Sequence, residues 1–168
     1  EVRDILQLQK QYARFMLVLN VGGVVDLSAV VDEVSNILLI SQPGIAVGDA
    51  FADVLLGKAY PSGKLASTWA AWQDYCPMAE FGDPNDTRYK EGIYVGYRWF
   101  DTRKVTPQFP FGHGLSYTTF TYGKPRLSAA SMTQAGRLTV TVDVTNTGKR
   151  EGKEIVQLYI GDEKASVD

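Results

Sequence analysis

The sequence has few of the residues that bind metals or cross-link a chain. Its 168 residues include one cysteine, Cys76, and one histidine, His113. A single cysteine cannot form an internal disulfide, and neither residue has a second ligand at the spacing of a zinc site. We therefore predict no metal site and no cofactor, and we interpret Cys76 as a small buried residue.

The sequence also lacks an excess of charge of one sign and any long apolar run. The formal net charge is -2, and lysine and arginine do not cluster, so nothing attracts nucleic acid or an anionic membrane. No apolar run approaches the roughly 20 residues that span a bilayer. We expect neither partner. The first ten residues lack the basic-then-apolar order of a signal peptide, but a fragment would not show one, so the localisation stays unknown.

What the sequence does contain is the composition of a globular protein. Hydrophobic residues make up 45 % and charged residues 21 %, values that are ordinary for folded domains. The first third alternates continuous apolar runs with helical periodicity, which is typical of parallel strands covered by helices. The predicted elements are helices over 2–12, 26–34 and 47–56, the second capped by Asp26 or Ser28, and strands over 15–20 and 36–41. They indicate an α/β class, as part of a layered α/β sandwich with largely parallel strands.

Residues 89–120 hold nearly half of the aromatic side chains. Their spacing is too irregular for one helix stripe, and glycines and prolines interrupt any long element. We predict a packed, irregular connector here, in which aromatic rings supply the buried area and glycines permit positive φ angles. A short strand over residues 65–69 precedes it, and residues 81–88 read as a polar loop rich in turn residues.

After residue 120 the pattern changes to strict alternation. Apolar residues recur at every second position over 138–145, and 154–160 supplies another strand pattern, while 120–128 offers a weaker first strand. Three strands are fewer than the about seven of a closed immunoglobulin-like sandwich. We therefore predict a partial all-β sandwich of this type.

Four aromatic residues are candidates for stacking on a sugar ring: Trp69, Trp72, Tyr94 and Trp99. Tyr75 lies close to the first two in the sequence. Pyranose faces pack on aromatic rings, but aromatic residues also dominate cores and domain interfaces. The second interpretation, packing, is the one that we favour for Trp69, Trp72 and Tyr75.

Glu91 is the best local candidate for a catalytic carboxylic acid. It stands beside Gly92 and near Tyr94 and Arg98, where a phenol and a guanidinium would orient it. The competing and preferred interpretation is structural, with Glu91 paired to an arginine such as Arg98, because buried charges need partners. His113 and Asp101 are likewise interpreted as structural residues of turns or helix ends.

Two motifs resemble the carboxy-terminal signature of glycoside hydrolase family 3 enzymes of the β-glucosidase type. They are EGIYVGYRWFD at residues 91–101 and FPFGHGLSYTTF at residues 109–120. Three earlier stretches agree in order: LNVGG with VD at 19–26, ADVLLG at 52–57 and PSGKL at 61–65. The chain departs from the family pattern at residues 46–48, where Ala-Val-Gly replaces the usual Glu-Gly-Gly.

The resemblance implies a retaining β-glucosidase-like enzyme that removes terminal β-linked glucose from glycosides or oligosaccharides. It also implies that the nucleophile lies in a separate barrel domain and the acid/base before residue 1, so no catalytic residue is assigned here. The expected domains are residues 1–88 of an α/β sandwich, the connector 89–120, and an incomplete fibronectin type III-like sandwich over 121–168. We expect the remaining domains of the enzyme, or a second copy of this chain, as partners.

Three alternatives remain open. The FPFGHG turn is also reminiscent of β-xylosidase members of the same family. A module that binds carbohydrate without cleaving it, or a purely structural module, would use the same aromatic residues. Exposure separates the carbohydrate-binding module from the enzyme scaffold, because a binding platform needs several open rings whereas a scaffold buries most of them. A purely structural module is distinguished from the enzyme scaffold only by finding or excluding the two carboxylates.

Overall fold

The computed structural model describes residues 1–75, 83–86 and 88–161. Cys76, predicted to be buried, lies outside the described residues. The chain forms two compact units. Unit 1 comprises Glu1–Ala59 and Lys64–Gly114, and unit 2 comprises Tyr60–Gly63 and Leu115–Asp168. The change of unit after Gly114 falls inside the predicted connector of residues 89–120.

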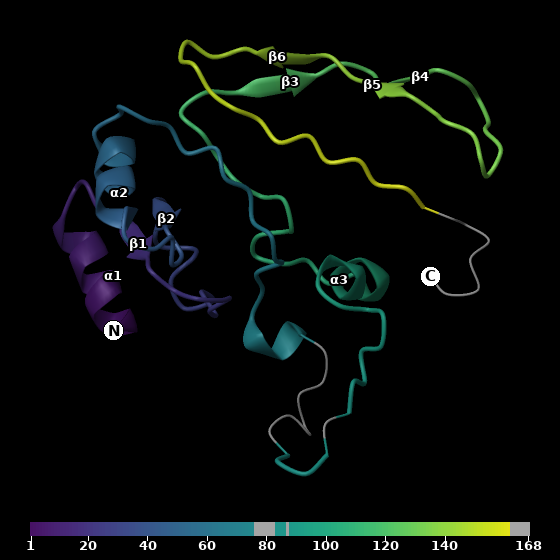
Figure 1. Ribbon diagram of the computed structural model, residues 1–168. Coiled ribbons are helices and arrows are strands. Elements are labelled where there is room, and N and C mark those ends of the chain that lie inside the picture. The colour runs from purple at the N-terminus through teal and green to yellow at the C-terminus, as the bar shows by residue number, and fades with distance from the viewer. Residues whose placement is uncertain (76–82, 87, 162–168) are drawn as a thin grey trace. The chain divides into compact units, whose positions relative to one another are not determined.

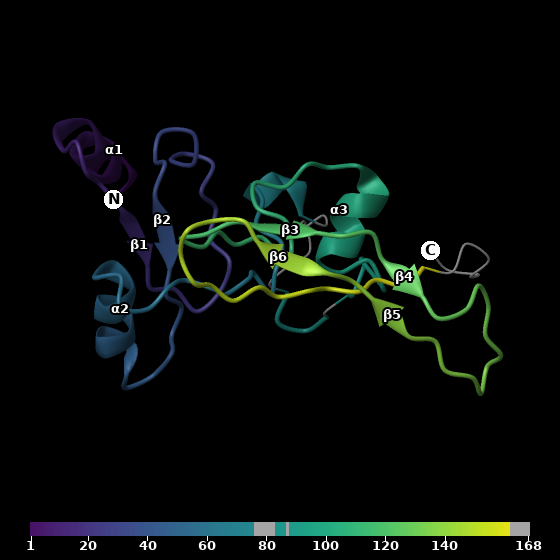
Figure 2. The same ribbon diagram turned by 90° about the horizontal axis from the view of Figure 1, so that it is seen from above.

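Unit 1 begins with the predicted helices and a parallel pair of strands. Helix α1 spans Val2–Gln11, strand β1 Leu17–Leu19, strand β2 Ile37–Leu39 and helix α2 Val47–Leu55. Strand β1 pairs in parallel with β2, Leu17 opposite Ile37, as the two apolar runs predict. In both views α1 and α2 are drawn to the left of this pair (Figures 1 and 2). Helix α2 ends where Gly57 adopts a φ of 70°, a conformation that glycine reaches without steric cost.

The prediction of a helix over residues 26–34 is wrong, because this segment consists of consecutive turns. Leu27 O accepts hydrogen bonds from the N–H groups of Val30 and Val31, both at 2.9 Å, and Val30 O accepts from those of Glu33 at 3.1 Å and Val34 at 3.0 Å. Three valines within five residues weaken a helix by restricting side-chain rotation. The helical spacing that suggested a helix nevertheless serves the core, since Leu27, Val30 and Val34 are all buried.

The strand predicted over residues 65–69 is also corrected. Its pairing with residues 109–113 is discontinuous: Trp69 and Phe109 form an isolated antiparallel bridge, and Leu65 N–H donates to His113 O at 2.8 Å. Between these two points the backbone does not follow a strand. Trp69 belongs to the core cluster with Leu27, Val30 and Val34, so this irregular segment is held by burial more than by a ladder of hydrogen bonds.

The aromatic stretch contains one helix that sequence analysis missed. Helix α3 spans Tyr97–Arg103, and a 3-10 turn, η1, spans Trp72–Asp74 before this stretch. Gly96 at φ 61° precedes α3, and Lys104 at φ 57° ends it, so the helix is only 7 residues long. Its buried residue is Phe100. A helix this short shows no repeated periodicity, which is why the sequence pattern did not reveal it.

Unit 2 is an antiparallel ribbon of short strands. Strands β3 (Phe120–Tyr122) and β4 (Arg126–Leu127) pair with β6 (Val144–Asn146) and β5 (Val140–Thr141), respectively. Figure 2 shows the two pairs following one another along the ribbon. The weak strand signal at 120–128 and the alternation over 138–145 are thus both confirmed, each as two short strands.

The strand predicted over residues 154–160 is not formed in the part of the chain that the structure describes, which ends at residue 161. A strand needs a hydrogen-bonded neighbour, and alternation alone does not supply one. Its apolar residues are exposed, Ile160 at 91 %. Among the described residues, unit 1 contains the α-helices and the parallel strand pair, whereas the strand pairs of unit 2 are antiparallel. None of the described helices has the length and apolar character needed to cross a membrane.

Candidate functional site

A pocket of about 180 Å³ opens in unit 1 where the chain after β1 meets the segment before η1. Its lining residues are Val24, Asp26, Ala70, Trp72 and Tyr75. Ala70 is buried, whereas the side chain of Trp72 is 60 % exposed. The pocket lining therefore combines a buried alanine with an exposed aromatic residue. We call it the Asp26 pocket.

Asp26 connects two segments that lie 46 residues apart in the sequence. Its Oδ1 accepts hydrogen bonds from the backbone N–H of Ser28 at 2.8 Å and from the Ser28 hydroxyl. Its Oδ2 accepts a bond from the backbone N–H of Trp72 at 2.8 Å. The Ser28 hydroxyl, the Trp72 N–H and the Ser28 N–H lower the pKa of Asp26 in that order, because all three stabilise the ionised form.

Tyr75 forms the wall of the Asp26 pocket through its ring, while its hydroxyl turns to the backbone. The hydroxyl donates to Thr68 O at 2.9 Å and accepts from Ala70 N–H at 3.3 Å. Burial raises the pKa of Tyr75, and the negative charge of Asp26 raises it further, against the lowering effect of the Ala70 hydrogen bond. The ring meets Phe100 edge-on at 5.4 Å between centroids. Tyr75 is thus neutral and fixed.

A second pocket of about 130 Å³ shares Tyr75 with the Asp26 pocket. It is lined by Tyr75, Glu91, Tyr94, Val95, Gly96, Trp99 and Phe100. The Trp99 indole N–H donates to Asp74 O at 2.9 Å, and the guanidinium of Arg103 lies 4.8 Å from the Trp99 ring centroid. The polar edge and one ring face of Trp99 are therefore already in contact with protein.

The family model of the glycosyl hydrolase family 3 C-terminal domain matches residues 3–117. The chain belongs to this family. The resemblance carried by the motifs at 91–101 and 109–120 is thereby confirmed. This family 3 chain is 51 % identical over 143 residues to a beta-glucosidase of Bacteroides ovatus, covering 82 % of the chain and 19 % of that protein.

Other relatives agree. A beta-xylosidase of Formosa agariphila is 39 % identical over 152 residues, covering 90 % of this chain and 20 % of that protein. Among solved structures, a beta-glucosidase from Streptomyces venezuelae in complex with D-glucose has a TM-score of 0.77 at 39 % identity, covering 89 % of this chain and 19 % of that one. The family 3 chain thus spans about a fifth of the length of these relatives.

The structure of the family 3 chain separates the predicted site residues into three places. Trp72 lies on the Asp26 pocket, whereas Glu91, Tyr94 and Trp99 line the second pocket. Trp69 is 5 % exposed and packs in the core, so it presents no ring face for stacking. From the sequence, Asp26 is predicted as a helix cap and as part of the family-like stretch at 19–26, without a role in a pocket. Its signal was a serine two residues later, the pattern in which an aspartate side chain accepts the N–H of the next residue but one.

His113 and Arg98 have structural surroundings. The His113 ring lies 5.1 Å from that of Phe109, and burial, followed by the charge of Lys64, lowers the His113 pKa. Arg98 lies 5.8 Å from the centroid of the Tyr97 ring. The pairing of Glu91 with Arg98 stays a prediction.

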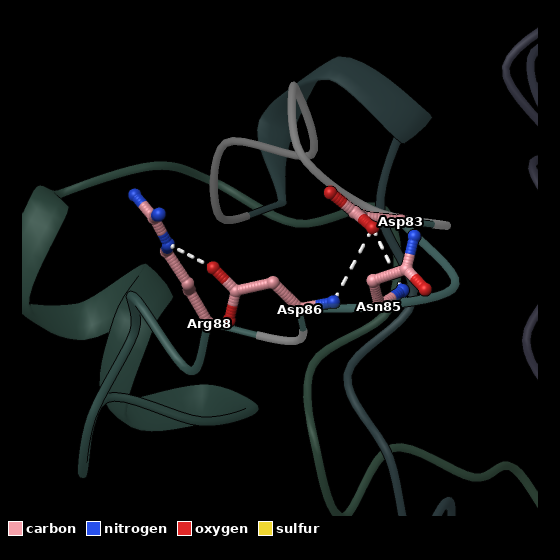
Figure 3. A network of polar contacts seen from close by, with 4 residues as sticks. All are labelled: Asp83, Asn85, Asp86 and Arg88. Carbon is pink, nitrogen blue, oxygen red and sulfur yellow. Dashed lines mark hydrogen bonds and ion pairs between the residues drawn. The ribbon is translucent and has the colours of Figure 1, made fainter.

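The polar loop predicted over residues 81–88 is a set of local contacts where it is described. Asp83 Oδ1 accepts the backbone N–H groups of Asn85 at 2.8 Å and Asp86 at 3.2 Å, and Arg88 Nε donates to Asp86 Oδ2 at 2.8 Å (Figure 3). Arg88 and Asp86 are more than half exposed, so the pair contributes little to stability. Among the residues that the structure describes, no three histidine, cysteine or acidic side chains gather as metal ligands would.

Proposed function

We propose that this chain is a portion of a retaining β-glucosidase-like glycoside hydrolase, which removes terminal β-linked glucose from glycosides or oligosaccharides. The observation that carries the proposal is the 51 % identity over 143 residues to a protein named beta-glucosidase. The shared stretch includes the motifs that hold the second pocket. The substrate is accordingly a β-glycoside or an oligosaccharide, and the chemistry needs no cofactor.

The chain is proposed to brace the active site without completing it. Retaining hydrolysis needs two carboxylates about 5 to 5.5 Å apart, one as nucleophile and the other as acid/base. Asp26 is poorly suited to either role, because three donors already occupy its oxygens. Glu91 in the second pocket is the remaining local candidate, and its preferred role is structural. Both catalytic carboxylates are therefore expected in the rest of the enzyme.

The finer architecture belongs to the same proposal. Residues 1–88 form part of a layered α/β sandwich, 89–120 connect it, and 121–168 begin a fibronectin type III-like, immunoglobulin-like sandwich. The parallel pair β1 and β2 supports the first assignment, and the antiparallel ribbon supports the last. The partners are the other domains of the enzyme, in the same chain or a separate one, or a second copy of this chain.

A β-xylosidase is the second candidate function, favoured by the 39 % identity over 152 residues to a protein of that name. The two sugars differ by the hydroxymethyl group of glucose, which a xylosidase site need not accommodate. A carbohydrate-binding module without hydrolysis is the third, and the exposed ring of Trp72 favours it.

Hydrolysis of matched chromogenic substrates tests these candidates. A β-glucoside and a β-xyloside with the same leaving group are compared, using the full-length enzyme and the 168-residue chain. We expect the full-length enzyme to prefer the glucoside and the chain alone to be inactive. If the full-length enzyme prefers the xyloside, the proposed substrate is wrong and the β-xylosidase function is supported. Activity of the chain alone would overturn the scaffold role, and Glu91→Gln would then be the first variant to assay.

A further inference from the structure

We propose that the Asp26 pocket binds one neutral pyranose ring, with Trp72 as the stacking surface and Asp26 as the hydroxyl acceptor. The proposal rests on the proposed function for the class of ligand, a glycoside. It goes beyond that function in assigning a separate sugar site to this chain. Asp26 and Tyr75 are part of this proposed sugar site, whereas buried Trp69 is not.

Trp72 has the properties of a preorganised stacking surface. Its side chain is 60 % exposed, whereas its backbone N–H is held by Asp26 Oδ2 at 2.8 Å. The turn that follows is closed by a bond from Asp74 N–H to Ala71 O at 3.0 Å. Because the backbone is held and the indole has only two rotatable bonds, ordering the ring on binding costs little conformational entropy. An exposed indole on a fixed turn is suited to the apolar C–H face of a pyranose.

The donor and acceptor positions that the protein leaves unused in the pocket determine which ligand groups can bind there. A carboxylate has about four acceptor positions, and the described residues occupy three of those on Asp26. The remaining position is on Oδ2, which accepts one bond whereas Oδ1 accepts two. The Trp72 indole N–H has no protein partner within the described residues, so the pocket offers one acceptor and one donor. A polyol can use both.

The charge of the pocket selects against acidic sugars. The hydrogen bonds to Asp26 favour its ionised form, and the described lining contains no cation to balance it. The Tyr75 hydroxyl is already engaged with Thr68 and Ala70. A carboxylate on the ligand would therefore face Asp26 without a compensating donor other than the indole N–H. A glucoside should bind and the corresponding glucuronide should not.

The size of the pocket limits the ligand to a single ring. A volume of about 180 Å³ is below the roughly 300–1,000 Å³ of pockets that enclose drug-sized ligands. Tyr75 lines both this pocket and the second pocket, which contains Glu91, so we expect it to separate the two. A disaccharide is therefore expected to gain little affinity in this pocket over a methyl glycoside.

The test follows the three indole N–H signals by NMR while methyl β-D-glucoside is added to the 168-residue chain. Substitution of each tryptophan by phenylalanine assigns the signals. We expect the Trp72 signal to shift saturably, while that of buried Trp69 stays in place and serves as an internal control. A Trp72 signal that does not move, or equal movement of all three signals, would overturn the proposal.

Variants separate stacking from hydrogen bonding. Trp72→Ala should weaken binding at least about tenfold and Trp72→Phe about threefold, because phenylalanine keeps a ring but loses the donor. Asp26→Asn should weaken glucoside binding and reduce the discrimination against the glucuronide. A dispersed spectrum shows whether each variant is folded. Because both Trp72 variants lack the indole signal, their affinity is measured by calorimetric titration with methyl β-D-glucoside. If Asp26→Asn does not fold, these two variants, altered at an exposed side chain outside the core, still decide the outcome.

The outcome is independent of the proposed enzyme activity. If the full-length enzyme hydrolyses β-glucosides but the Trp72 signal does not shift when methyl β-D-glucoside is added, the proposed sugar site is wrong and the proposed β-glucosidase function is unaffected. If the signal responds but the enzyme has no glycosidase activity, the pocket stands and the carbohydrate-binding alternative gains support. Equal affinity for the glucoside and the glucuronide would overturn the assignment of Asp26.

Discussion

The two units contain similar apolar residues but use them differently. Among the described residues, every buried one lies in unit 1, including Leu27, Val34, Trp69 and Phe100. Unit 2 exposes Leu127, Val144 and its whole apolar run after Ile155 instead, with exposures of 38 % or more. A layer buries an apolar face only against another layer, and a two-stranded ribbon has none. Alternation in a sequence thus predicts a strand without ensuring a core.

Polar contacts partly replace the missing core in unit 2. Arg126 makes two hydrogen bonds to the Asp143 carboxylate, at 2.8 and 3.2 Å. The hydroxyls of Thr119 and Thr147 lie 2.9 Å apart across the ribbon. Cross-strand pairs of this kind contribute about 0.2–1 kcal/mol each. Unit 1 is therefore expected to resist unfolding more strongly than unit 2, and four experiments would break or sharpen this contrast.

The largest effect is expected at the core of unit 1. Trp69→Ala should lower the free energy of unfolding by about 3–5 kcal/mol, because it removes a buried ring and leaves a cavity. Denaturant titration measures the change. Trp72→Ala is the matched control, since the same residue type is removed from an exposed position, and it should change the value by less than about 0.5 kcal/mol. Equal losses would contradict the assignment of Trp69 to the core.

The next effect is expected where unit 2 is tightly packed. A Cβ at Gly152 would lie 2.6 Å from Thr118 Cγ2 and 3.1 Å from Phe120 Cζ, whereas one at Gly161 meets nothing within 4 Å. Gly152→Ala should therefore cost about 1–3 kcal/mol through overpacking, and Gly161→Ala should be neutral. Hydrogen exchange of the β3 and β6 amides reports on unit 2 directly. Unchanged protection in Gly152→Ala would mean that residues 118–120 are not packed as described.

A smaller effect concerns the link that Asp26 makes within unit 1. Its pKa is lowered in the folded state, so the stabilisation is present above the unfolded pKa and is lost as the pH falls through the folded pKa. As the pH falls from about 5 through the folded pKa, the native chain should lose stability that Asp26→Asn does not lose. Thermal unfolding across this range checks the prediction. Parallel pH profiles for both proteins would show that Asp26 does not contribute.

The smallest effect is expected at the Arg126–Asp143 ion pair of unit 2. Both side chains are more than 60 % exposed, so a double-mutant cycle with Arg126→Ala and Asp143→Ala should give about 0.2–1 kcal/mol of coupling. The coupling should shrink in 1 M salt. A value above about 2 kcal/mol would indicate that the pair is shielded from solvent and that unit 2 is more enclosed than its exposed residues suggest.

The amino-acid sequence by itself determined the features that rest on local periodicity and on motifs. It predicted α1, α2, the parallel strands β1 and β2, and, from alternating apolar residues, the strands of unit 2. The motifs at residues 91–101 and 109–120 identified the family. In each case the signal is contained in a few neighbouring residues, such as the continuous apolar run that becomes β1.

Only the tertiary structure decided which residues meet across long separations. Residues 26–34 form turns where a helix was predicted. Burying Leu27 and Val34 requires the spacing between them, but it does not require a continuous series of helical hydrogen bonds. The apolar run at 154–160 formed no strand where it is described, since a strand depends on a neighbour. The Asp26 pocket exists because a carboxylate reaches a backbone N–H 46 residues away, and no local pattern records a contact between segments brought together by folding.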